Sequence, residues 1–329
     1  MTQPATPPTR SAGLRTAGRL LREFGMPLVF VAAILATAII HPNFGSFDLQ
    51  SLALGALPLA MAAAAQAIVV ISGGIDLSVG SQIAVANVLS ARLMQNASFE
   101  ESLAIAVLIL LAGGVIGALN GIVAALSRIP DVVVTLTTGF IWGGVALLIM
   151  ERPGGGAPAA FLNIASGIDF SEWVPNAFIV IVVVIAAIWL PIRQSRIGLL
   201  IYAAGSDPVA AFRSGVDVRV ARTLAYAFAG VACAAGGIGL TMTTGIGAPL
   251  AGTYYTLSSV AAAVIGGVSL TGGRGGMVGP VAAALLLTLI PMDLIFLNID
   301  PNYGQVIQGT LIVLVVMVGG FVAFMQERK

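Results

Sequence analysis

Residues 72–82 read Ser-Gly-Gly-Ile-Asp-Leu-Ser-Val-Gly-Ser-Gln and interrupt a long apolar stretch with glycines, serines and a carboxylate. In hydrocarbon an unpaired backbone N–H or C=O costs several kcal/mol. A non-helical turn at membrane depth therefore persists only against protein or beside a water-filled cavity. The break points to a pathway through a membrane protein.

A similar break occurs in the second half of the chain. Residues 266–273 (Gly-Gly-Val-Ser-Leu-Thr-Gly-Gly) align with residues 73–80, which lie 193 positions earlier, and four positions are identical. Interrupted spans at corresponding places in two halves of a membrane protein indicate a transport site. We therefore expect the breaks to line a substrate pathway through Gly73, Gly74, Asp76, Ser78, Gly266, Gly267 and Ser269.

The composition sets the class of protein. The chain is 58% hydrophobic and 9% charged, with a mean hydropathy of +1.02, whereas soluble domains are about 45–50% apolar and about 25% charged. A net charge of +1 argues against a nucleic-acid partner. The single Cys233 and the single His41 leave no disulfide, metal site or cofactor site to expect. Without such clusters or a paired acidic motif, an enzyme is disfavoured.

The apolar stretches predict an all-α, polytopic membrane protein with one transmembrane domain over residues 25–325. Residues 1–24, rich in Thr, Pro and Ala, predict a disordered cytoplasmic tail. A signal peptide is disfavoured because no small-residue cleavage site precedes His41. Spans of about 20 residues cross a bilayer. About ten spans, some of them shorter, are expected at residues 26–40, 51–71, 83–94, 103–126, 132–150, 177–192, 223–246, 254–270, 277–297 and 305–324.

Basic residues give the expected orientation, because loops on the cytoplasmic side hold the excess of Lys and Arg. With ten spans and an inside N-terminus, thirteen of the fifteen basic residues fall on the inner side. Only Arg92 and Arg152 fall near the outer face. Both termini are therefore expected in the cytoplasm.

Small residues mark one helix face in the fourth span. Gly113, Gly117 and Gly121 recur every four residues, which predicts that another helix packs closely against this face.

Residues 193–222 form the longest charged stretch between the expected spans and contain five arginines. Within this cytoplasmic loop, Ser206 or Asp207 can cap a helix. Pro208 suits its first turn and Gly215 can end it. The result is a helix of about two turns, too short to be stable alone in water. It must dock on the membrane face or on a partner.

Three stretches resemble the hallmark segments of the ribose-type ABC sugar permeases, namely residues 71–80, 202–215 and 264–275. The resemblance runs from about residue 41 to the C-terminal tail and is specific to the family, not to one sugar. It implies import of ribose, xylose, arabinose, galactose or a related monosaccharide across the bacterial inner membrane. In this family, two permease subunits, identical or paralogous, form the pathway. A cytoplasmic ATPase with two nucleotide-binding cassettes drives it, and an extracytoplasmic binding protein delivers the sugar.

The resemblance also gives the short helix a role, because ABC importers insert a Glu-Ala-Ala-x-x-x-Gly coupling helix into a groove of the ATPase. Here Val209 replaces the glutamate, and the small Ala210, Ala211 and Ser214 are expected to share the face toward the ATPase. The chain has no Gly-x-x-x-x-Gly-Lys-Ser/Thr phosphate loop, so ATP and magnesium would bind to the partner subunit. The expected ATPase contacts are Asp207, Pro208, Ala210, Ala211, Phe212, Arg213, Ser214 and Gly215.

Two alternatives stay open. A branched-chain amino-acid ABC permease would have a similar architecture. An ion-coupled secondary transporter would use an intramembrane carboxylate, with Asp76 as the first candidate and Asp131 and Asp293 as weaker ones. Asp76 also has a structural interpretation as the cap of the third helix.

Overall fold

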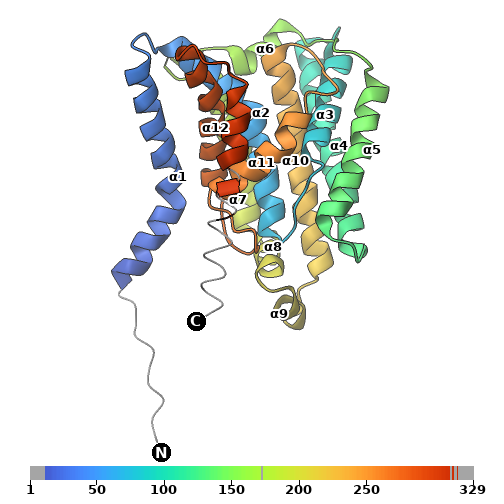
Figure 1. Ribbon diagram of the computed structural model, residues 1–329. Coiled ribbons are helices and arrows are strands. Elements are labelled where there is room, and N and C mark those ends of the chain that lie inside the picture. Colours follow the sequence, from blue (N-terminus) through green and yellow to red (C-terminus); the bar gives the residue numbers. More distant parts are fainter. Residues whose placement is uncertain (1–11, 172, 312, 315–316, 318–329) are drawn as a thin grey trace, which may run out of the picture.

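The computed structural model describes residues 12–171, 173–311, 313–314 and 317, with side chains from residue 24 onward. Over these ranges the chain is a helical bundle without a β-strand (Figure 1). Its elements are α1 (Ala12–Ile40), α2 (Ser46–Ile71), α3 (Val79–Met94), α4 (Phe99–Leu126), α5 (Asp131–Ile149), α6 (Ala159–Ser166), α7 (Asn176–Gln194), α8 (Arg196–Ser206), α9 (Pro208–Arg213), α10 (Val218–Thr244), α11 (Thr253–Ile265) and α12 (Val278–Phe296).

The core of the bundle forms around α2, which packs against α10, α11 and α12. Residues 56–71 of this helix are buried without exception. Its middle is an alanine run, residues 62–65, whose small side chains let neighbouring helices approach closely. A helix that is apolar on all sides and buried is expected at the centre of a membrane bundle rather than against lipid.

The glycine face of α4 packs against α10, and the predicted close helix packing is confirmed. Methyl groups at Gly113 or Gly117 would collide with the backbone of Gly230, and one at Gly121 would collide with Thr223 and Tyr226. These small residues bring α4 and α10 into backbone contact, which fixes the position of α10 for the site described below.

At the edge of the bundle, α1 packs along α12. The Thr37 hydroxyl donates to Asp293 at 2.8 Å, and the ring of His41 stacks on Phe296 with centroids 4.0 Å apart. The helix begins at Ala12, inside the stretch predicted as a tail, so residues 12–24 are helical rather than disordered. The sequence explains this difference, because the last proline of the stretch is Pro8 and Ala, Leu and Arg, all strong helix formers, follow it.

Within the described ranges, six helices are long and apolar enough to cross a membrane: α2, α4, α5, α7, α10 and α12. Residues 24–40 and α11 form shorter apolar helices. Ten crossings therefore remain a prediction. Of the tenth expected span, residues 303–311 are helical, and most of the remainder lies outside the described residues.

The expected boundaries differ from the structure where polar residues begin a helix. α10 starts at Val218 rather than at residue 223, because the Asp217 side chain accepts hydrogen bonds from the N–H groups of Arg219 and Val220. The loop predicted after the fifth span contains the short helix α6. Figure 1 shows α8 and α9 together at one end of the bundle, hereafter the α9 end.

Candidate functional site

The first glycine break begins where α2 ends in a Schellman turn, a helix end closed by two backward hydrogen bonds. Gly73 has φ +87°, and its N–H donates to Val70 O at 3.0 Å, while Gly74 N–H donates to Val69 O at 3.0 Å. Residues with a Cβ atom rarely adopt this left-handed conformation, so glycine is the residue that this turn requires.

The second break ends α11 with the same turn. Gly267 has φ +86°, its N–H donates to Val264 O at 3.0 Å, and Val268 N–H donates to Ala263 O at 3.0 Å. The conformational equivalent of Gly73 is therefore Gly267, 194 residues later, and not Gly266 as the sequence alignment proposes. Gly266 instead lies against Gly279 and Pro280 at the start of α12.

Both breaks meet α8 at the α9 end. Methyl groups at Gly205 would collide with Ile71 O and with Gly273 N, so these backbones touch without intervening side chains. Gly273 N–H donates to Ile71 O at 2.9 Å. The Tyr202 hydroxyl donates to Gly275 O at 2.6 Å. The three segments that carry the family resemblance thus form one junction, hereafter the glycine junction (Gly73, Gly205, Gly272 and Gly273).

Asp76 lies inside the first break and is completely buried. Its Oδ1 accepts from the backbone N–H of Ser78 at 2.7 Å and from the Ser78 hydroxyl. Its Oδ2 accepts from Gln82 Nε2 at 3.1 Å. The bond to Ser78 N–H closes an Asx turn directly before α3. The N-cap residue of α3 is Ser78 and not Asp76. Hydrogen bonds of this kind offset the cost of burying a carboxylate.

Further polar side chains extend this network between helices. Asn120 Nδ2 donates to Ser78 Oγ at 2.8 Å, and Trp142 Nε1 donates to Asn120 Oδ1 at 3.0 Å. The Gln66 amide, oriented so that both of its atoms are satisfied, donates to Asp76 O at 2.8 Å and accepts from Asp76 N at 3.3 Å. Side chains from α2, α3, α4 and α5 thus converge on a single stretch of irregular backbone.

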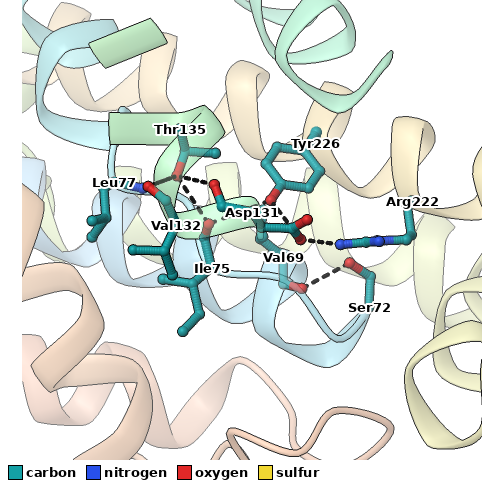
Figure 2. Close-up of polar contacts among 9 residues, drawn as sticks. All are labelled: Val69, Ser72, Ile75, Leu77, Asp131, Val132, Thr135, Arg222 and Tyr226. Carbon is teal, nitrogen blue, oxygen red and sulfur yellow. Dashed lines mark hydrogen bonds and ion pairs between the residues drawn. The ribbon is translucent and has the colours of Figure 1, made fainter. Parts of the chain in front are cut away.

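A charged cluster adjoins the same stretch of backbone at residues 75–77 (Figure 2). Arg222 of α10 forms an ion pair with Asp131, the first residue of α5. The Tyr226 hydroxyl lies 3.3 Å from Asp131 Oδ2 and 3.4 Å from Ile75 O. Thr135 donates to Ile75 O at 3.1 Å and accepts from Leu77 N–H at 3.0 Å. The backbone on both sides of Asp76 is therefore held by side chains of α5 and α10.

The expected pathway residues occupy different environments. Gly74, Asp76, Ser78 and Gly266 are buried, whereas Gly73 and Gly267 are exposed and Ser269 is half-buried. The two breaks come together at the glycine junction and not along one open wall. Whether these residues line a pathway stays a prediction.

Several residues of this site were not singled out from the sequence: Gln66, Gln82, Asn120, Thr135, Trp142, Arg222 and Tyr226. One signal could have found some of them, because Gln66, Asn120 and Tyr226 are polar residues inside strongly apolar stretches, where such residues face the bundle interior.

The short helix α9 forms where its local signals place it. Asp207 accepts from the N–H groups of Val209 and Ala210, Pro208 occupies the first turn, and Gly215 follows the helix with φ +85°. These parts of the prediction are confirmed.

The orientation of α9 differs from the expected one. Ala211 is buried against the chain itself, with 6% of its surface exposed, whereas Phe212 is 73% and Val209 60% exposed. Ala210, Arg213 and Ser214 are also exposed. The surface free for a partner therefore consists of Asp207, Pro208, Val209, Ala210, Phe212, Arg213, Ser214 and Gly215. Ala211 cannot belong to it, because its side chain already packs inward.

Over the described ranges, no group of three His, Cys, Asp or Glu side chains is close enough to hold a metal ion. The fold and the two interrupted helices place the protein in the class of polytopic helical membrane transport proteins.

Comparison with known proteins identifies the family. Residues 49–316 match the family model described as the permease component of the branched-chain amino acid transport system. The ribose import permease protein RbsC of Escherichia coli K12 is 30% identical over 305 residues, covering 88% of this chain and 91% of the relative. The galactose/methyl galactoside import permease protein MglC of the same strain is 29% identical over 313 residues, covering 90% and 93%.

The D-allose transport system permease protein AlsC of E. coli K12 is 32% identical over 245 residues, which is 74% of each chain. No solved structure matches the chain. The chain belongs to the monosaccharide ABC permease family. Family membership and its apolar helices make it a multi-pass inner-membrane protein.

Proposed function

We propose that the chain is the membrane-spanning subunit of an ABC importer for a monosaccharide. The observation that carries this proposal is the similarity, over about nine-tenths of both chains, to permeases named for ribose and galactose. A second permease copy or a paralogue completes the pathway. A separate ATPase that binds ATP and magnesium drives transport, and an extracytoplasmic binding protein delivers the sugar.

The α9 end supports this proposal because it presents a ready docking element. α9 is capped at both ends and exposes Val209, Phe212 and Arg213. Exposed aromatic and arginine side chains are typical anchors of protein interfaces. We propose that α9 docks in a groove of the ATPase. Docking there would set the α9 end on the cytoplasmic side, in agreement with the distribution of basic residues. From that charge distribution we also propose that both chain termini are cytoplasmic.

The glycine breaks suit a moving pathway under this proposal. Both join the glycine junction beside α8, so a displacement of the coupling segment reaches both breaks through backbone contacts. We propose that Gly73, Gly74, Asp76 and Ser78 with Gly266, Gly267 and Ser269 form the cytoplasmic portion of the path. Ser269 offers a hydroxyl group of the kind that hydrogen-bonds sugars, whereas the Ser78 hydroxyl is already bonded to Asp76 and Asn120.

A second candidate substrate is a branched-chain amino acid, because the description of the matching family model names that transport system. The individual relatives named for sugars favour a monosaccharide. Ion-coupled transport through Asp76 is the weaker alternative, since this carboxylate is completely buried and is occupied by Ser78 and Gln82.

The test is uptake by proteoliposomes that contain the chain, its cognate ATPase and its binding protein. Radiolabelled D-ribose, D-galactose, D-allose, D-fructose and L-leucine are offered with and without ATP. The proposal predicts ATP-dependent uptake of one of the sugars. ATP-dependent uptake of L-leucine alone would support the amino-acid permease, and ATP-independent uptake that an ionophore abolishes would support a secondary transporter.

A further inference from the structure

The helix that follows α9 is tied to it by a short connection. Only residues 214–217 separate α9 from α10, and Val216 N–H donates back to Ala211 O at 3.0 Å. Asp217 caps the first turn of α10. Because this connection is short and hydrogen-bonded, we expect a displacement of α9 to move the start of α10 as well.

One turn into α10, Arg222 forms its ion pair with Asp131 of α5. The side chains are 24% and 12% exposed, so the pair is partly shielded from water and from salt. Arg222 lies on α10, the helix that follows α9. Asp131 lies on α5, the helix whose Thr135 hydrogen-bonds to the backbone of the first glycine break.

Tyr226, one further turn along α10, connects this pair to the break itself. Its hydroxyl lies within reach of two acceptors, Asp131 Oδ2 at 3.3 Å and Ile75 O at 3.4 Å. A phenol has a single proton to donate, so the hydroxyl can satisfy one of the two acceptors at a time. A small displacement of α10 is enough to change which acceptor it serves.

The break lies directly against the pair. A methyl group at Gly74 would come within 2.7 Å of Asp131 Oδ2 and 2.9 Å of the Tyr226 hydroxyl. Because Gly74 has no side chain, its backbone can lie directly against Asp131 and Tyr226. No side-chain contact of this kind joins the second break to the pair among the described hydrogen bonds and ion pairs.

From these contacts we propose that Arg222 and Asp131 are positioning residues that transmit the position of α9 to the first glycine break, with Tyr226 as the connecting group. This inference rests on the proposed function, because α9 is the element that the ATPase would move. Docking of the ATPase displaces α10, α10 carries Arg222 and Tyr226, and these two side chains reposition the backbone around Asp76.

The test uses Arg222→Glu, Asp131→Arg and the double variant that exchanges the two charges, in proteoliposomes with the ATPase and binding protein. Arg92→Glu is the matched control, because Arg92 is an exposed arginine in the last turn of α3, at the end away from the break. The probe is whichever of radiolabelled D-ribose, D-galactose, D-allose and D-fructose the wild-type chain takes up. ATP hydrolysis with and without the loaded binding protein is measured in parallel.

Each single reversal is expected to lower uptake about tenfold or more, since it sets two like charges beside each other in a partly buried site. The ATPase still co-purifies with these variants and hydrolyses ATP, but the loaded binding protein no longer stimulates it. The double exchange restores uptake and stimulation to within about threefold of wild type, as expected of two residues that act as a pair.

A merely structural pair would lower membrane abundance, ATP hydrolysis and uptake together, and that outcome would overturn the proposal. Tyr226→Phe supplies a second test that keeps the packing and removes only the hydroxyl. It is expected to lower stimulated uptake about threefold at normal abundance, the size of one lost hydrogen bond. Unchanged coupling in this variant would also overturn the proposal. Failure of the wild-type chain to transport any sugar would instead refute the proposed function.

Discussion

The two glycine breaks share a backbone turn and differ in what surrounds it. After Gly73, the chain encloses a carboxylate that is completely buried and bonded to Ser78 and Gln82. After Gly267, the hydroxyls of Ser269 and Thr271 lie 2.7 Å apart at the surface, the Tyr202 hydroxyl donates to Gly275 O, and Val268 is buried. Equal helix ends thus lead into one sealed polar network and one partly exposed loop.

This difference indicates unequal rigidity. The first break is held by side chains from four neighbouring helices, whereas the second is held mainly by backbone bonds, such as Ser269 N–H to Arg274 O at 3.1 Å and Gly273 N–H to Ile71 O at 2.9 Å. Segments with few buried contacts open at lower free energy than well-packed ones. We therefore expect the second break to open locally at lower free energy, whereas the first moves together with the side chains of α5 and α10 that hold it.

The largest effect is expected at the point where the two breaks meet. Gly205→Val places a branched side chain against Ile71 O and Gly273 N, which are backbone atoms that no rotamer change can move aside. Overpacking usually costs about 1–3 kcal/mol, and here we expect the upper end of that range or more. Membrane abundance and thermal unfolding in detergent measure it. Normal abundance with a normal melting temperature would contradict the glycine junction.

A smaller effect is expected from the carboxylate that distinguishes the first break. Asp76→Ala leaves the donors of Ser78 and Gln82 without their acceptor, and each buried unpaired donor costs about 1–3 kcal/mol. Asp76→Asn keeps an acceptor for Ser78 N–H. Its new amide can donate to Gln82 Oε1, which has no partner among the described residues.

Thermal unfolding and uptake separate the roles of Asp76. If it only holds the turn before α3, the Asn variant unfolds and transports nearly as wild type, while the Ala variant is destabilised by about 2 kcal/mol. Loss of uptake in the Asn variant at normal abundance would show a pathway role as well. Normal behaviour of both variants would remove Asp76 from either role.

Because both breaks contain the same turn, the same substitution can be made in each and the losses of stability compared. Gly73→Ala and Gly267→Ala each force an L-residue into a left-handed conformation, at a cost of about 1–2 kcal/mol. Gly45→Ala is the control, because Gly45 has φ −146° as the N-cap of α2 and an added methyl group would meet only Asn43 O, at 3.8 Å. We expect similar destabilisation for the first two and a smaller one for the control, which loses only the N-cap preference of glycine over alanine. If alanine is tolerated equally well at all three positions, the two turns do not require glycine, and the case for a paired functional role fails.

The smallest effect is expected in the second break. Ser269→Ala and Thr271→Ala remove a surface hydrogen bond, and surface substitutions usually change stability by less than about 0.5 kcal/mol. Thermal unfolding should show little change. A loss as large as that of Asp76→Ala would mean that the second break is anchored as firmly as the first.

Local signals in the sequence predicted local structure well. The cap at Asp207, the first-turn proline and the stop at Gly215 give α9 because each acts within a few residues. The ends of α2 and α11 follow from the same logic of glycine at a left-handed position.

The polar network could not be predicted in this way. Gln66, Asn120, Trp142 and Tyr226 lie on four different helices, and their meeting at residues 75–78 depends on how these helices are rotated and packed. The one-residue error in the alignment of the breaks has a similar cause, since the letters match best at an offset of 193 residues, whereas the left-handed glycines of the two turns lie 194 residues apart. The φ angles of Gly73 and Gly267 show this register.

The most consequential wrong prediction concerns Ala211, whose side chain packs inward instead of facing a partner. Sequence spacing put Ala210, Ala211 and Ser214 on one face, but tertiary contacts decide which part of a short helix remains exposed. Ala211→Glu would therefore disturb the chain itself rather than report on a partner. A test of docking must change Phe212 instead.

Capture of the ATPase by the permease tests the central claim most directly. Phe212→Glu changes the most exposed large apolar side chain of α9 and leaves buried packing untouched. Phe170→Glu is the matched control, because Phe170 is 78% exposed in the loop between α6 and α7. The account predicts that the Phe212 variant reaches normal abundance, loses co-purification with the ATPase and loses ATP-driven sugar uptake, while the Phe170 variant retains the ATPase. Wild-type ATPase binding and uptake in the Phe212 variant would contradict a coupling role for α9.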